Sequence, residues 1–240
     1  MTLLGDAAVA MWWNVADNDR TEFHEWHSKE HLPERLSISG FNRGSRWQAD
    51  EAGAFFVLYE LQTYETLTSQ GYLTRLNDPT PWSTEMMPLH RGMVRSQCRV
   101  LASNGLGVAG VMHTIRMSPE PGRESALKRF LVDLVARVPQ VPGFTGAHLL
   151  QTETPAAAPT REQQIRGGDA AADWILLVAG HAATAVPQLF DGQPPSSRLV
   201  AEGAAETPVV GRFQLVHAVT AGDVATTTEK MEEGRDAHTS

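Results

Sequence analysis

Residues 22–47 hold the greatest concentration of side chains that could do chemistry. The segment reads EFHEWHSKEHLPERLSISGFNRGSRW and combines three histidines with glutamates, arginines and two tryptophans. On a helix with 3.6 residues per turn, Phe23, Trp26 and Glu30 would share the side that faces the core. Glu30 would then be a desolvated carboxylate beside imidazoles, and general acid–base catalysis near neutral pH uses such pairs.

Three histidines occupy the flank next to that carboxylate. His24, His27 and His31 follow one another at i, i+3 and i+7, and His31 lies where the helix is expected to stop before a proline. Arg35 and Arg46 follow and could stabilise an oxyanion or hold an anionic group. We therefore expect His31 to be the main acid–base residue, with Glu30, His27, Arg35 and Arg46 in support.

Structural roles compete with this interpretation. Glu30 could form an ion pair with an arginine, and His31 could bond the free carbonyl groups at the helix end. The three histidines could also hold a metal, but their spacing is not the compact spacing of helical zinc motifs, and no carboxylate completes an obvious ligand set. We expect no metal and no organic cofactor, because the sequence also lacks a GxGxxG motif and a P-loop.

Aromatic residues around the helix predict an apolar pocket in the N-terminal half. Five of the six tryptophans fall within residues 1–82, although core packing alone would also bury them. The irregular stretch 77–89 could form a rim or lid over such a pocket. The expected substrate-binding residues are Trp12, Asn14, Phe23, Trp26, Trp47, Tyr59 and Trp82.

The order of the expected elements repeats along the chain. In the first half, apolar and β-branched runs predict strands at 8–15, 43–49, 55–62 and 92–102, with helices at 19–31 and 64–76. The second half shows the same order, with strands at 107–117, 147–152, 174–181 and 212–219 and helices at 123–138 and 183–190. Each half reads βαββαβ, and the turn Ser39-Gly40-Phe41 recurs as Pro142-Gly143-Phe144.

This repeat predicts an α+β protein made of two ferredoxin-like units. A βαββαβ unit forms a four-stranded sheet with both helices on one face, so the other face must be covered. Two tandem units can cover each other as an intrachain α/β-barrel. We expect residues 1–105 to carry the site and residues 106–220 to be scaffold, with a long mobile loop at 153–173 and a disordered tail at 221–240.

Composition excludes several classes of function. A net charge of −8 and a pI near 5.6 argue against a nucleic-acid partner. The single cysteine, Cys98, fits a reducing compartment. The first residues lack the basic start of a signal peptide, and no apolar run approaches a membrane span. We expect a cytoplasmic protein without a membrane partner.

The N-terminal half resembles the EthD-like branch of the dimeric α/β-barrel (ferredoxin-like) superfamily. The resemblance rests on the pattern W-x4-H-x-PER-x4-GF-x4-RW at residues 26–47, and on the run LNxPTPW at 76–82 followed by Met87-Pro88 and Arg95. It covers residues 8–102 and extends to the second half by architecture alone. His27 stands where this branch usually has a tyrosine.

The resemblance implies several activities, because the superfamily includes monooxygenases, cyclases, isomerases, dehydratases, haem enzymes and stress-response proteins. Our first hypothesis is a cofactor-independent enzyme of isomerase, dehydratase, lyase or cyclase type that acts on a small, hydrophobic, carbonyl-bearing or phenolic substrate. The alternatives are a monooxygenase, either cofactor-free or metal-assisted, and a non-catalytic ligand-binding or stress-response protein. A homodimer is one possible assembly.

Overall fold

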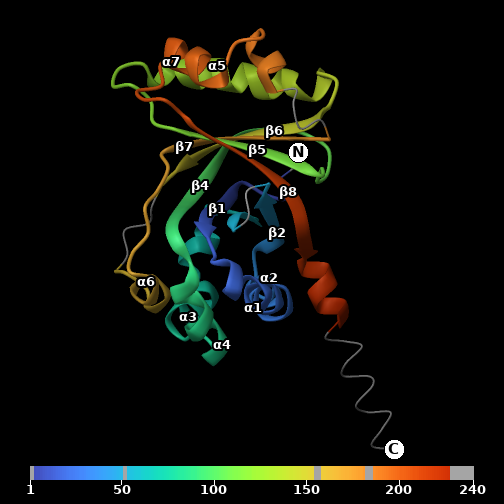
Figure 1. Cartoon of the computed structure of the whole chain (residues 1–240), viewed down its shortest axis with the longest axis vertical. Helices are drawn as coiled ribbons and strands as arrows, with labels where there is room; N and C mark the ends of the chain where they lie inside the picture. Colours follow the sequence, from blue (N-terminus) through green and yellow to red (C-terminus); the bar gives the residue numbers. More distant parts are fainter. Residues whose placement is uncertain (1–2, 51–52, 154–157, 182–185, 228–240) are drawn as a thin grey trace, which may run out of the picture.

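The computed structural model describes residues 3–50, 53–153, 158–181 and 186–227. Eight antiparallel strands close into a barrel in the order β1-β3-β2-β8-β5-β7-β6-β4 (Figure 1). The strands are β1 Ala7–Asn14, β2 Phe41–Ala49, β3 Ala54–Leu61, β4 Arg91–Gly105, β5 Val111–Met117, β6 Phe144–Thr152, β7 Trp174–Gly180 and β8 Val209–Thr220. The α-helices are α1 Arg20–Trp26, α2 Leu32–Leu36, α3 Gln70–Asn77, α4 Pro81–Met86, α5 Glu124–Arg137, α6 Arg161–Arg166 and α7 Pro195–Glu202.

The barrel consists of two equivalent four-stranded sheets. The first half contributes the strand order β4-β1-β3-β2 and the second half contributes β8-β5-β7-β6, so corresponding strands take corresponding places. The two sheets join through the antiparallel pairs β2–β8 and β4–β6. This arrangement confirms the predicted fold of two ferredoxin-like βαββαβ repeats stacked within one chain.

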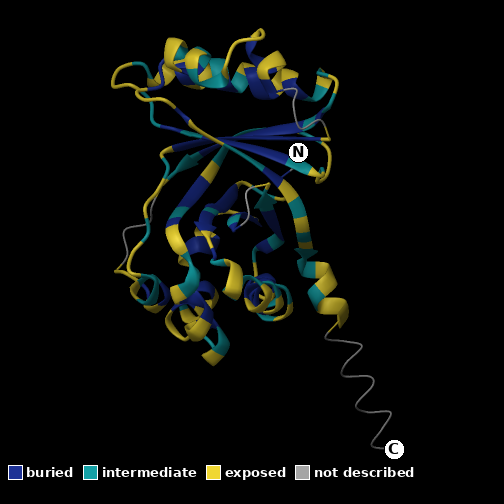
Figure 2. Ribbon diagram, viewed as in Figure 1, coloured by how far each residue is buried: buried dark blue, intermediate teal, exposed yellow. Residues whose placement is uncertain are grey.

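Strand alternation divides the apolar side chains into three cores. Side chains that point into the barrel, such as Trp12, Trp47 and Phe56, form the central core. Side chains on the opposite face of the first sheet, including Trp13, pack under α1, α2 and α3. The second sheet packs under α5 and α7 in the same way. Strands such as β1, β3 and β7 are largely buried, whereas β8 is mostly exposed or half-buried (Figure 2). The barrel therefore lies between two helical layers.

The helix that bears the expected acid–base residues differs from a regular α-helix. Its middle, His27–His31, is a π-helical turn, and α2 continues from it through Pro33. We expected the helix to stop before this proline. Pro33 instead lies inside a continuous helix, directly after the π turn, where the register of the backbone hydrogen bonds changes. The wider π turn, closed by i→i+5 bonds, reduces the rotation per residue and turns His31 toward the sheet.

The segment 153–173 was expected to be a mobile loop, but it contains helix α6. Thr160 and Gln163 form a capping box at the start of this helix. The helix lies beside α3 at the first-half end of the molecule, far from α5 and α7 of its own half (Figure 1). Its Glu162 is buried and forms an ion pair with Arg35 of α2. The second half therefore contributes a wall to the helical layer of the first.

Two further expectations need correction. The second helix of the second half was expected at 183–190, of which residues 183–185 lie outside the described residues. Val186–Phe190 forms a short 3-10 turn, and the α-helix follows as α7. Residues 221–227 of the expected disordered tail are helical, and Val224 packs against the first-half core. Residues 228–240 lie outside the described residues. Within the described part of the chain, no helix is long and apolar enough to cross a membrane.

We predict that Glu162→Ala destabilises the protein strongly. Removal of one partner from a buried ion pair costs about 3–5 kcal/mol, because the remaining charge, here Arg35, stays buried. Urea denaturation gives the free energy of unfolding. Glu153→Ala is the matched control, since its ion pair with Arg99 is half-exposed and exposed pairs contribute about 1 kcal/mol or less. Equal effects for the two variants would show that α6 is not anchored through Glu162.

Candidate functional site

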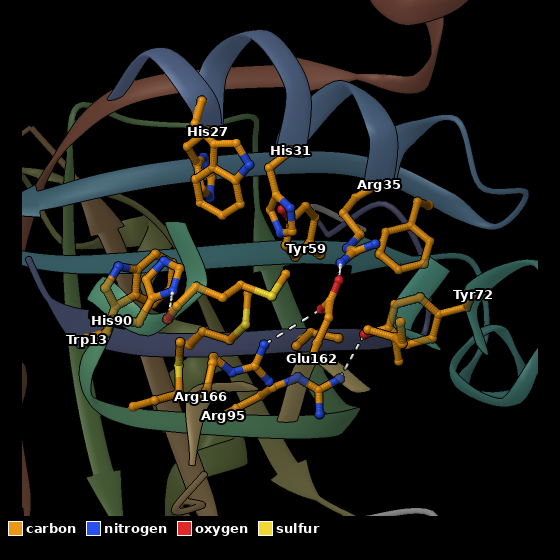
Figure 3. Close-up of a pocket in the computed structure, with 17 residues that line it drawn as sticks. Trp13, His27, His31, Arg35, Tyr59, Tyr72, His90, Arg95, Glu162 and Arg166 are labelled. Atoms are coloured by element: carbon orange, nitrogen blue, oxygen red, sulfur yellow. Dashed lines mark hydrogen bonds and ion pairs between the residues drawn. The ribbon is translucent and has the colours of Figure 1, made fainter. Parts of the chain in front are cut away.

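A narrow cavity lies between the first sheet and its helices, and α6 closes one side of it. Its volume is about 30 Å³. Figure 3 shows side chains from the π turn, from the sheet and from α6 converging on this space. The lining residues are Val9, Met11, Trp13, Trp26, His27, His31, Arg35, Phe41, Tyr59, Tyr72, Leu76, Met87, His90, Met93, Arg95, Glu162 and Arg166.

Three histidines share this cavity. His27 and His31 are 1% and 8% exposed, and their ring centroids are 5.5 Å apart. His31 packs on Trp26 with a centroid distance of 4.5 Å. His90 lies 4.8 Å from Trp13, edge to face, and its Nδ1 is 3.1 Å from the carbonyl oxygen of Met87. When Nδ1 of His90 carries the proton and donates it to this carbonyl, Nε2 keeps a free lone pair.

All three histidines are held in the neutral form. Burial is the main cause that lowers the pKa of His27, and the charge of Arg46 lowers it further. Burial and then Arg35 lower the pKa of His31 well below its usual value. Burial and then Arg166 lower the pKa of His90 to about 3. At neutral pH the cavity therefore offers imidazole lone pairs rather than imidazolium charges.

The opposite side of the cavity carries a network of charges. Glu162 forms ion pairs with Arg35 and Arg166, and Arg166 also pairs with Asp169 at 2.8 Å. Burial acts to lower the pKa of Arg35, but Glu162 outweighs it and the pKa is raised. This network ties α6 to α2 and fixes the guanidinium groups around the cavity.

Arg95 and Tyr59 have polar groups that no acidic partner occupies. Nη2 of Arg95 donates to the hydroxyl of Tyr72 at 2.8 Å, and Arg95 forms no ion pair with any described residue. The hydroxyl of Tyr59 is buried and has no hydrogen-bond partner in the described part of the protein. Burial raises the pKa of Tyr59, so this hydroxyl remains a hydrogen-bond donor. Together they could accommodate a substrate oxygen that gains negative charge.

Glu34 stands behind His31. Its Oε2 lies 3.9 Å from Nδ1 of His31, and its side chain is 10% exposed. Burial raises the pKa of Glu34, while Arg35 and Arg75 act in the opposite direction. Nδ1 of His31 has no hydrogen-bond partner in the described part of the chain, so at this distance the carboxylate can act on the imidazole through its charge alone.

Five of the twelve expected site residues line the cavity, and two charged ones do not. His27, His31, Arg35, Trp26 and Tyr59 belong to it. Glu30 lies outside the cavity and accepts hydrogen bonds from the hydroxyls of Thr80 at 2.5 Å and Ser83 at 3.3 Å. The π turn explains this position, because it rotates the helix after His27 and exchanges Glu30 for His31 on the side facing the sheet.

Arg46 also lies outside the cavity. Its Nη2 donates to the hydroxyl of Ser28 at 2.9 Å, and its guanidinium carbon is 5.7 Å from the ring centroid of Phe23. Burial lowers the pKa of Arg46 to about 10. From outside the cavity, its charge lowers the pKa of His27.

The remaining five expected residues are apart from the cavity for reasons of strand and helix geometry. Trp12 and Trp47 point into the barrel, on the sheet face opposite the helices. Phe23 is 1% exposed and packs behind His27 with a centroid distance of 5.4 Å. Asn14 is exposed, and Trp82 donates from Nε1 to Glu22 at 2.8 Å.

Sequence reasoning missed several residues that line the cavity. Trp13 rather than Trp12 faces the helices, and a one-residue error in register exchanges the two faces of a strand. His90 and Arg95 carried no local pattern that assigns them to the site. Glu162 was missed although the capping-box pattern of Thr160 and Gln163 signals the start of a helix. The missed lining residues with polar or aromatic groups are Trp13, Phe41, Tyr72, His90, Arg95, Glu162 and Arg166.

Comparison with known proteins identifies the fold class. No family model matches the chain, and no curated protein matches it. Solved structures match over 90% of the chain. An anthrone oxidase-like protein aligns with a TM-score of 0.60 at 15% identity over 94% of its own chain. Candidate monooxygenases from Fusobacterium nucleatum and Lactobacillus acidophilus align with TM-scores of 0.59 and 0.56, at 7% and 9% identity, over 95% and 97% of their chains.

These similarities place the fold among the dimeric α/β-barrel, ferredoxin-like proteins, and at such identities they show the fold alone. Within the residues that the structure describes, no three side chains of histidine, cysteine, aspartate or glutamate lie together as metal ligands would.

We predict that acid destabilises the protein through its buried histidines. Below pH 6.5 a histidine in the unfolded chain binds a proton, whereas His27 in the folded protein stays neutral. The free energy of unfolding therefore falls by about 1.4 kcal/mol for each unit by which the pH is lowered, for each such residue. Urea denaturation at pH 7 and pH 5.5 measures this slope. His27→Leu should reduce it, whereas His181→Ala, at an exposed position, should leave it unchanged. An unaltered slope in His27→Leu would mean that His27 is protonated in the folded protein.

Proposed function

We propose that the protein is a cofactor-independent enzyme that removes a proton from a small, hydrophobic, phenolic or carbonyl-bearing substrate. The observation that carries this proposal is the buried, neutral His31, which lines the cavity with Glu34 behind its Nδ1 at 3.9 Å. A neutral imidazole is the base form, and a carboxylate behind it stabilises the imidazolium that forms when the substrate gives up its proton.

The same cavity offers partners for the negative charge that proton removal leaves on the substrate. Arg95 brings a guanidinium that no described carboxylate neutralises, and Tyr59 brings an unpartnered hydroxyl. Fixed donors in a site with little water stabilise an enolate or phenolate oxygen strongly. His31, once protonated, could return the proton to a different atom of the substrate, as an isomerase, dehydratase, lyase or cyclase requires. His90, whose Nδ1 faces the carbonyl of Met87, could act as a second base and remove a further proton.

Substrate size and polarity follow from the walls. Trp13, Trp26 and Phe41 supply aromatic surface, and Met11, Met87 and Met93 supply flexible apolar surface. The cavity is narrow, about 30 Å³, so a substrate with rings requires the flexible methionine side chains to move aside. A substrate with a phenolic or carbonyl oxygen would place that oxygen at the polar side and its rings among the aromatics.

Oxygen insertion is the second candidate. Apolar cavities bind small nonpolar gases, and the deprotonated carbon could react there with dioxygen to form a C–O bond. The hydroperoxide would take its proton from His31 and lose water, leaving a carbonyl group, so one oxygen atom enters the product and the other leaves as water. Structures of similar fold include an anthrone oxidase-like protein and candidate monooxygenases, which motivates this alternative at the fold level. The motif at residues 26–47 also supports a proposed place in the EthD-like branch.

We predict that His31→Ala lowers turnover by about 10²–10⁴-fold, the usual range for a general acid–base residue. A panel of phenols and aryl ketones in deuterated water tests this, because abstraction of a C–H proton exchanges it for deuterium, which proton NMR detects. His217→Ala, a histidine outside the cavity, is the matched control and should retain activity. Circular dichroism must show both variants folded. More than half of wild-type activity in His31→Ala would contradict the assignment.

We also predict an unusually broad pH range. Because burial lowers the pKa of His31, the base form persists below pH 6.5, and kcat/KM should stay constant there instead of halving near 6.5 as for an ordinary histidine.

Incubation of an active compound with ¹⁸O₂ distinguishes oxygen insertion, which labels the product, from proton transfer, which does not. Compounds that bind without exchange or product formation would favour a non-catalytic binding protein.

A further inference from the structure

A second hollow opens at one mouth of the barrel, where β1 ends, β3 begins and β8 begins. Its volume is about 410 Å³, compared with about 30 Å³ for the cavity beneath the helices. Trp12, Thr114 and Arg116 line its inner side, and Val209 and Phe213 of β8 line its outer side. This hollow lies on the opposite face of β1 from the candidate active site, because Trp12 and Trp13 point in opposite directions.

Arg116 is held in place within this hollow. Its guanidinium carbon lies 4.8 Å from the ring centroid of Trp12. Trp12 in turn stacks on Phe56 at 5.0 Å, and its Nε1 donates to the hydroxyl of Thr114 at 3.2 Å. A guanidinium group that stacks on a fixed indole ring keeps its orientation, and its N–H groups then point outward in the plane of the guanidinium, away from the ring. The side chain is therefore pre-organised to receive a ligand.

No carboxylate in the described part of the chain neutralises Arg116. It takes part in no ion pair and no hydrogen bond there, and burial is the one cause that lowers its pKa. Asp50, the acidic residue among those lining this hollow, already pairs with Arg212. Asp173 and Glu206 line the adjoining hollow without an ion pair to Arg116. A half-buried cation without a counter-charge is an attractive place for an anion.

The walls beside Arg116 are apolar and open. Val209 lies directly across from Arg116 in the β5–β8 pair and is 54% exposed. Gly211 keeps the space free, since a Cβ there would lie 2.6 Å from the Phe213 ring. An open apolar surface next to one fixed cation matches a molecule with an apolar body and one negative group.

We propose that this barrel mouth is a binding site for a small apolar monocarboxylate. The carboxylate accepts hydrogen bonds from the guanidinium of Arg116, and the apolar body lies against Val209 and Phe213. The site is separate from the proposed catalytic cavity and does not depend on the proposed function.

Isothermal titration with octanoate and with 2-naphthoate tests the proposal, and 1-octanol and 2-naphthalenemethanol serve as uncharged counterparts. The expected result is a Kd of about 1 mM or below for the carboxylates and much weaker binding of the alcohols. Arg116→Met should weaken carboxylate binding by at least about 10-fold, the scale of a hydrogen bond to a charged group. Arg95→Met, which alters the other cavity, should not weaken it.

Two further measurements locate the ligand. Val209→Asp puts a negative charge beside Arg116 at an exposed position, so it should abolish carboxylate binding without unfolding the protein. The indole N–H signal of Trp12, assigned as the NMR resonance absent from Trp12→Phe, should shift on titration, whereas those of Trp13 and Trp26 should not. Undetectable binding at several millimolar, equal binding by Arg116→Met, or shifts confined to Trp13 and Trp26 would overturn the proposal.

Discussion

Each half of the chain forms a sheet with helices on one side and apolar side chains on the other, and neither sheet can leave that second face in water. Stacking the two sheets buries Trp12, Trp47, Phe56 and their neighbours in a common interior. Closure through the β2–β8 and β4–β6 pairs also removes the exposed sheet edges. Helices are thereby confined to the outside, and a ligand cavity beneath them is separated from the barrel interior by one layer of backbone.

The two halves have diverged within this common frame. In the second half, Leu127, Leu131 and Leu134 of α5 pack on the sheet, and the space between helix and sheet is filled by apolar side chains. In the first half, the π turn brings His27 and His31 to the equivalent layer, where aromatic rings surround them. The second half acts on the first through α6, which crosses to the first helical layer and inserts Glu162. An insertion in one repeat has thus become part of the other repeat's cavity.

Burial and positive charge act together on the histidines. His27 and His31 are buried, and the cations Arg35, Arg46 and Arg166 lie close enough to oppose protonation of the rings. The pKa of Arg35 is itself raised, because Glu162 outweighs the effect of burial. The cavity is therefore an apolar space with fixed positive charge and neutral bases, an environment that favours anions formed from neutral substrates over ligands that arrive as cations.

Local sequence determined the element order, the duplication, the barrel, and the importance of the helix from Arg20 to Leu36, because hydrophobic periodicity and turn residues act over short distances. It also singled out His27, His31, Arg35, Trp26 and Tyr59, all of which line the cavity. Tertiary structure decided the rest. The register of β1 places Trp13, and not Trp12, on the face of the sheet that lines the cavity. The π turn places His31, and not Glu30, on the side of the helix that faces the sheet. Each outcome depends on a shift of one residue, which composition does not reveal. Glu162 and Arg166 lie more than 120 positions from Arg35, and only the packing of α6 against α3 brings them to the site.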